Sequence, residues 1–166
     1  MFGEQLIKAG IKSIRDGSND FKPLIAGDDR IHNSLKNVGI DIPITDMDLM
    51  FYYLDWESWQ TILTIIHNIL KDYKWEAERY DCDNRSAVVS GLVSTLFRVN
   101  TCNQLYCTVS DKNDKQLYHH WCNIITDVSG NSYIFDLDNF GMRGKITSKN
   151  PILGNLKYEL KAVRAG

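Results

Sequence analysis

The second half of the sequence alternates between short strand-like segments and clusters of turn-forming residues, and this pattern most limits the folds that the chain can adopt. Residues 110–115 are rich in Asp, Asn and Lys, and residues 129–131 form a Ser-Gly-Asn turn. Turns this short join antiparallel neighbours, so the pattern predicts a mostly antiparallel sheet. Its strands are expected at 104–109, 117–128, 132–138 and 156–163, with a shorter one near 145–147.

The first half of the sequence instead places apolar residues at helical spacing. They cover a wide arc from Trp59 to Leu70, a second helix is expected from Cys82 to about Val99, and a short one at about 31–37. Helices come first along the chain and strands follow. This order predicts an α+β fold, with a helical N-terminal half packed on a mostly antiparallel sheet from the C-terminal half.

Cys82 lies where an irregular segment gives way to the second helix. Asp81, Asp83 and Asn84 are all residues that begin helices well. Unpaired backbone N–H groups and the positive end of the helix dipole favour an anion there, so a thiolate forms more easily than on a free cysteine. This position is typical of a nucleophilic cysteine.

Two histidines and two carboxylates follow in the predicted strands. His119 and His120 lie in one strand, and Asp136 and Asp138 lie in the next. Alternate residues of a strand face opposite sides of a sheet, so only one of the two histidines can face Cys82. Cysteine, histidine and carboxylate side chains that meet in this way can act as nucleophile, base and orienting group.

Three short motifs resemble the transglutaminase-like cysteine proteinases, relatives of the papain-like fold, in the versions found in bacteria and their phages. They are Asp-Cys-Asp-Asn at 81–84, His-x-x-Asn at 120–123 and Asp-x-Asp-Asn at 136–139. The resemblance covers about residues 56–140 and leaves the first 45 unmatched. It implies a papain-like or transglutaminase-like core and a thiol hydrolase or acyl-transferase. Such an enzyme acts on an amide or related acyl group of a peptide or protein substrate and needs no cofactor.

The resemblance also ranks the site residues. It implies Cys82 as nucleophile, His120 as base and Asp138 as the acid that orients the base. The pattern His-x-Trp selects His119 instead, and Asp136 lies on the same strand face as Asp138, so His119 and Asp136 are second choices.

Two other interpretations compete with the hydrolase. Asp81 and Asp83 flank Cys82, and negative charge so close opposes a thiolate, which favours a catalytically inactive member of the fold used for binding or for phage structure and assembly. The third interpretation is a zinc-binding module, because zinc accepts cysteine and histidine ligands. Its four candidate ligands are Cys102, Cys107, His120 and Cys122.

Glycine and proline interrupt the first 45 residues, so we expect 1–45 to be an N-terminal arm or cap that can bind a protein partner, and 46–166 to be the domain. A short amphipathic helix is expected at 1–16.

A net charge of −2 gives no general attraction to nucleic acid, so nucleic-acid binding is unsupported. The sequence has neither a signal-peptide pattern nor an apolar run of about 18 residues. We therefore expect no membrane association and a cytoplasmic protein, or a virion-associated one if a phage encodes it.

Overall fold

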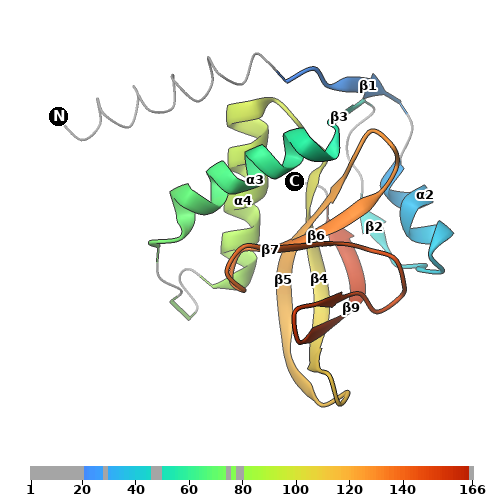
Figure 1. Ribbon diagram of the computed structural model, residues 1–166, viewed down its shortest axis with the longest axis vertical. Coiled ribbons are helices and arrows are strands. Elements are labelled where there is room, and N and C mark those ends of the chain that lie inside the picture. The colour runs from blue at the N-terminus through green and yellow to red at the C-terminus, as the bar shows by residue number, and fades with distance from the viewer. Residues whose placement is uncertain (1–20, 28–29, 46–49, 74–75, 78–80, 165–166) are drawn as a thin grey trace.

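The computed structural model describes residues 21–27, 30–45, 50–73, 76–77 and 81–164, and shows a twisted sheet with helices packed against it (Figure 1). The helix expected at 1–16 lies outside the described residues. The helices are α2 (Arg30–Asn37), α3 (Trp56–Leu70) and α4 (Cys82–Phe97). The strands are β1 (Leu24–Ala26), β2 (Ile44–Thr45), β3 (Phe51–Tyr53), β4 (Cys102–Asp111), β5 (Gln116–Thr126), β6 (Ser132–Asp136), β7 (Met142–Lys145), β8 (Ile152–Leu153) and β9 (Leu156–Arg164).

Seven strands form the main sheet, and its order differs from the order along the chain. The strands run β2-β9-β4-β5-β6-β7, with β8 paired to β9 beside them. The pairings are antiparallel except for β2 with β9, which is parallel. β9, the last strand in sequence, therefore lies inside the sheet. β1 and β3 pair separately as a small two-stranded sheet.

Each face of the main sheet has its own apolar core. The neighbouring residues Ile124 and Ile125 on β5 belong to different cores, as expected from the alternation of side chains along a strand. Ile125 packs in the core that α3 and α4 cover, and Ile124 packs in the core that α2 covers. The register of β5 places His120 on the same face as Ile124.

An aspartate stands at the N-cap position of each of the two long helices. Asp55 precedes α3, and its carboxylate accepts a hydrogen bond of 2.7 Å from the backbone N–H of Ser58. Asp81 takes the N-cap position of α4 with an extended backbone, so Cys82 is the first helical residue. The predicted place of Cys82 in the first turn of a helix is confirmed.

Asp127 organises the turn that joins β5 to β6. Its buried carboxylate accepts hydrogen bonds from the backbone N–H groups of Ser129 and Asn131, both at 2.9 Å, and from the Tyr133 hydroxyl at 3.0 Å. Gly130 has a φ of +75° in this turn, a conformation that suits glycine. The predicted Ser-Gly-Asn hairpin is confirmed.

The predicted fold class is wrong in its division into a helical half and a sheet half. The first half also supplies β1, β2 and β3, and β2 enters the main sheet beside β9. More described residues lie in strands than in helices. Strands of two or three residues are too short to show an alternating pattern, and their pairing partners are distant in sequence.

Residues 21–45 supply β1, α2 and β2, and the boundary at residue 45 stays a prediction. Within the described part of the chain, no helix combines the length and the apolar character needed to span a bilayer.

Candidate functional site

A cavity of about 540 Å³ opens where the N-terminus of α4 meets β5 and the segment after β6. Most of its lining side chains are polar or charged, and two are tyrosines. The lining residues are Lys71, Tyr73, Cys82, Arg85, Tyr118, His119, His120, Asp136, Asp138 and Asn139.

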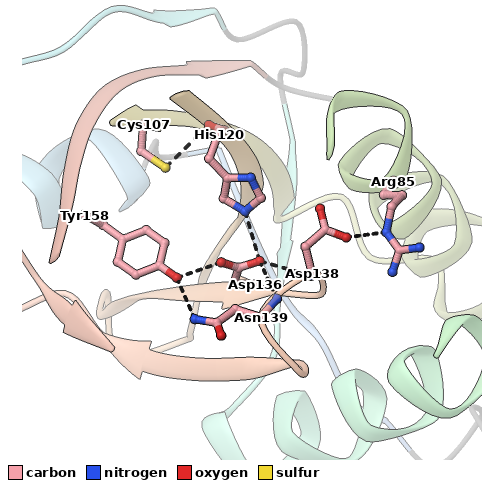
Figure 2. Close-up of polar contacts among 7 residues, drawn as sticks. All are labelled: Arg85, Cys107, His120, Asp136, Asp138, Asn139 and Tyr158. Carbon is pink, nitrogen blue, oxygen red and sulfur yellow. Dashed lines mark hydrogen bonds and ion pairs between the residues drawn. The ribbon is translucent and has the colours of Figure 1, made fainter. Parts of the chain in front are cut away.

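Asp136 lies at the centre of a buried hydrogen-bond network (Figure 2). One of its carboxylate oxygens is 3.0 Å from Nε2 of His120 and accepts the backbone N–H groups of Asp138 and Asn139. The other accepts the Tyr158 hydroxyl at 2.7 Å. Tyr158 in turn accepts the Asn139 side-chain amide at 3.2 Å. The network holds the His120 ring in one orientation toward the cavity.

The network sets the charges of His120 and Asp136. Burial of the imidazole acts to lower its pKa, but hydrogen bonds with Asp136 and Cys82 outweigh burial and raise the pKa of His120 to about 10. Burial acts to raise the pKa of Asp136, but the contact with His120 and the Tyr158 hydrogen bond hold it below its ordinary value. At neutral pH a cationic imidazole therefore faces an anionic carboxylate.

Cys82 differs from the other three cysteines because it is only half-buried and lines the cavity. Its side chain is a hydrogen-bonding partner of His120. Cys107 is buried, and its thiol donates to the backbone carbonyl of His120 at 3.4 Å. Burial raises the pKa of Cys102 to about 12 and raises that of Cys122 well above its usual value.

Buried polar contacts position the start of α4 relative to β5. The side-chain amide of Asn123 on β5 donates to the Ser86 carbonyl at 2.9 Å and to the Ser90 hydroxyl at 3.0 Å. Small side chains on α4 allow this close approach. Since Cys82 and Ser86 are one turn apart, these bonds also fix the distance between Cys82 and the strand that carries His120.

Asp138 faces the helix and not the histidine. Its carboxylate forms an ion pair with the guanidinium of Arg85, which also donates to the Tyr73 carbonyl at 2.6 Å. Burial raises the pKa of Asp138, against the opposing effect of Arg85. The structure therefore brings together Cys82, His120 and Asp136, and places Asp138 on the neighbouring wall.

His119 lies on the rim of the same cavity. Its Nδ1 is 3.3 Å from the Thr108 hydroxyl, and its ring stacks on Tyr106 with centroids 5.9 Å apart. Both predicted histidines therefore line the cavity, but only His120 contacts Asp136.

The described residues contain no group of three or more His, Cys, Asp or Glu side chains placed to hold a metal ion. Cys102 packs in the core under α3 and α4, whereas Cys107 and Cys122 pack in the opposite core. The zinc interpretation is therefore wrong for these cysteines.

The sequence patterns did not identify Tyr158 and Asn139 as members of the network, or Arg85 as the partner of Asp138. Tyr158 lies 22 residues after Asp136, and nothing in the spacing relates the two. Its place in the alternating Leu-x-Tyr-x-Leu pattern of β9 does indicate a buried tyrosine, whose hydroxyl needs a partner.

The comparisons with known proteins concern the fold. No family model matches the sequence, and no curated protein matches it. The solved structure of a PSL1a-E64 complex aligns with a TM-score of 0.59 and 16% identity, covering 85% of this chain and 51% of that chain. The structure of Polyporus squamosus lectin bound to human-type influenza-binding epitope Neu5Acα2-6Galβ1-4GlcNAc aligns with a TM-score of 0.56 and 16% identity, covering 81% of this chain and 47% of that chain. This chain thus spans about half of each.

These findings contradict the predicted family. The resemblance to transglutaminase-like or papain-like cysteine proteinases has no matching family model, and a structure that shares the fold is that of a lectin. The prediction of a thiol hydrolase or acyl-transferase with a Cys-His-Asp triad rested on that resemblance and is wrong with it. The roles of the individual residues Cys82, His120 and Asp138, with His119 and Asp136 as second choices, stay predictions.

Proposed function

We propose that this protein binds a carbohydrate in the cavity beside Cys82 and His120. The observation that carries the proposal is the lining of this cavity, which combines aromatic rings with charged donors and acceptors on a fold that is similar to that of a lectin structure. Binding sites for small ligands need a few convergent polar groups to fix orientation and a less polar surface for contact.

The lining suits the hydroxyl groups and C–H faces of a sugar ring. Lys71, Arg85 and the cationic His120 supply hydrogen-bond donors, while Asp138 and the Asn139 amide supply acceptors. Tyr118 offers an aromatic ring that is 44% exposed and is held edge-on by His120, with centroids 5.7 Å apart. Aromatic rings bind apolar surface through their faces, and a tyrosine hydroxyl adds a polar end.

The charges of the lining favour an acidic sugar. Lys71, Arg85 and His120 are the basic side chains of the lining. Asp136 and Asp138 are its carboxylates, and each is paired with one of these basic side chains. Lys71 thus leaves an excess of positive charge for the carboxylate of a sugar such as Neu5Ac. The saccharide bound in the lectin structure contains Neu5Ac, which makes it a suitable first probe.

Isothermal titration with Neu5Acα2-6Galβ1-4GlcNAc and with its three component monosaccharides tests the proposal. We expect the wild-type protein to bind the trisaccharide. The variant Tyr118→Ala should bind it about five-fold more weakly, because a stacking surface is lost. Leu117→Ala is the matched control, since Leu117 is equally exposed, lies next to Tyr118 and does not line the cavity.

Failure of the wild-type protein to bind a broad panel of neutral and acidic glycans would contradict the proposed carbohydrate binding. Equal losses of affinity in Tyr118→Ala and Leu117→Ala would place the binding site elsewhere on the molecule.

The contact between Cys82 and His120 favours a second role for the same cavity, the binding of a thiol-reactive ligand. Cys82 is the one cysteine of the four that is not buried, and a cationic imidazole lies beside it. The Cys82 thiol is therefore open to a ligand in the cavity, whereas the other three thiols are buried. Because the PSL1a structure is a complex with E64, that compound is the probe.

Thiol alkylation followed by mass spectrometry tests this second role. Iodoacetamide transfers its carboxamidomethyl group to sulfur and releases iodide, so each modified cysteine is identified by its mass. We expect Cys82 to react first, while the buried Cys102 and Cys122 serve as internal controls. Prior incubation with E64 should protect Cys82. Equal labelling rates at all four cysteines, or no effect of E64, would contradict this role.

A further inference from the structure

Phe140 is the most exposed large apolar side chain in the described part of the chain, and it stands next to the cavity. Its side chain is 89% exposed, so it contributes little to either core. The preceding residue, Asn139, lines the cavity, and consecutive Cα atoms are only about 3.8 Å apart. Phe140 therefore directly follows a residue of the site, and its ring is open to solvent.

The backbone at Phe140 also departs from what an ordinary residue prefers. Its φ is +55°, in the left-handed region that asparagine and glycine adopt more readily than an aromatic residue does. Neither burial nor backbone preference thus explains a phenylalanine here. Such outliers concentrate at functional sites, where the surrounding structure enforces them.

Contacts on both sides hold Phe140 in place. The backbone N–H of Asn139 donates to Asp136 at 3.2 Å, and its side-chain amide donates to the Tyr158 hydroxyl. On the other side Gly141, with a φ of +66°, lies so close to the imidazole of His67 on α3 that a Cβ atom there would be 2.5 Å from the ring. The aromatic ring is therefore presented to solvent from a turn that is fixed at both ends.

We infer that Phe140 forms an outer aromatic subsite, which stacks on a second sugar ring when the first ring occupies the cavity. This inference rests on the carbohydrate binding proposed above and names the ligand class more closely, an oligosaccharide rather than a single sugar. Tyr118 lines the cavity, and the exposed ring of Phe140 follows Asn139, which also lines it. A fixed ring binds at a low entropic cost, because little motion is lost when the ligand stacks on it.

Titration of matched variants with the trisaccharide and with free Neu5Ac tests the inference. Phe140→Asn removes the ring and keeps a residue that tolerates the left-handed backbone, so its fold should persist. We expect it to weaken trisaccharide binding about two- to ten-fold and to leave monosaccharide binding unchanged. Phe140→Tyr keeps the ring and should bind as the wild type does.

Ile152→Asn is the control for loss of an exposed apolar side chain, because Ile152 is 69% exposed and does not line this cavity. Trisaccharide binding by Phe140→Asn that equals the wild type would overturn the inference alone. A wild-type protein that binds neither saccharide would overturn the proposed carbohydrate function, and the outer subsite with it.

Discussion

His120 and Asp136 carry opposite charges although both side chains are almost fully buried. The carboxylate keeps the imidazole protonated, so we expect Asp136→Asn to lower the pKa of His120 from about 10 toward its ordinary value of 6.5. The His120 ring protons, followed by NMR across a pH titration, measure this change.

Tyr158→Phe is the control for that titration, because it removes one hydrogen bond from Asp136 and leaves the carboxylate in place. His120 should then still titrate near pH 10. A similar high pKa in Asp136→Asn would show that another group holds the proton on the ring.

Gly141 and Gly130 allow backbone strain to be separated from steric conflict. Both have a positive φ, so alanine at either position costs about 1–2 kcal/mol of strain. A Cβ at Gly141 also meets the His67 ring, whereas at Gly130 nothing lies within 4 Å. We expect Gly141→Ala to destabilise the protein by about 1–3 kcal/mol more than Gly130→Ala, measured by urea denaturation. Equal effects would mean that His67 moves aside freely.

Among the helices and strands, length decides what could be predicted from the sequence. The expected helices at 59–70 and 82–99 correspond to α3 and α4, and the expected strands at 104–109 and 156–163 correspond to β4 and β9. These elements span several turns or several alternations, so their periodicity is clear. β1, β2 and β8 have two or three residues each, too few to show an alternating pattern, and the partners of β1 and β2 are also distant in sequence.

The two long hairpins of the sheet differ in how much of their turn is buried. Asp127, in the turn after β5, is buried and accepts several hydrogen bonds. Asp111, the last residue of β4, accepts the backbone N–H groups of Asn113 and Lys115 near solvent. We expect Asp127→Ala to cost about 2–4 kcal/mol, because its donors lose their partner in a buried site. Asp111→Ala should cost about 1 kcal/mol or less.

Urea denaturation of the two aspartate variants measures the difference. Equal destabilisation would show that water replaces the Asp127 carboxylate without cost, and that the buried turn is not a specific source of stability.

The ion pair in the site makes the stability of the whole molecule depend on pH. The pKa of His120 is about 10 in the folded state and 6.5 in the unfolded state, so between these values the unfolded chain binds fewer protons and stability falls as pH rises. Asp136 has its effect at acid pH. Its pKa is lower in the folded state than the ordinary value of 3.8, so its contribution to stability is present above pH 3.8 and is lost as the pH falls below that value.

We therefore expect a maximum of the melting temperature between about pH 5 and 6.5, and a loss on the order of 4 kcal/mol of unfolding free energy by pH 10. Thermal unfolding in a series of buffers measures this profile. The alkaline fall should be much smaller in Asp136→Asn, and an unchanged fall in that variant would assign it to other groups.

The site was predictable in part, because the sequence singled out the residues but not their partners. The helix-tip position of Cys82 and the histidine pair on a strand predict that one of the two histidines faces Cys82, and the choice of His120 rests on the resemblance. The resemblance ranks Asp138 above Asp136 because of a two-residue motif. In the structure Asp138 pairs with Arg85, whereas Asp136 contacts His120 and the Tyr158 hydroxyl on β9. The same short motifs led to the wrong family, since so few residues specify neither the whole fold nor its function.

The interior position of β9 has a consequence for synthesis on the ribosome. While residues up to about 155 are emerging, β4 has β5 on one side and an open edge on the other, because β9 has not yet been translated. Exposed strand edges invite association with other chains. Tyr158 reaches Asp136 only when β9 inserts, so the nascent protein closes its sheet and completes the hydrogen-bond network around Asp136 in the same step.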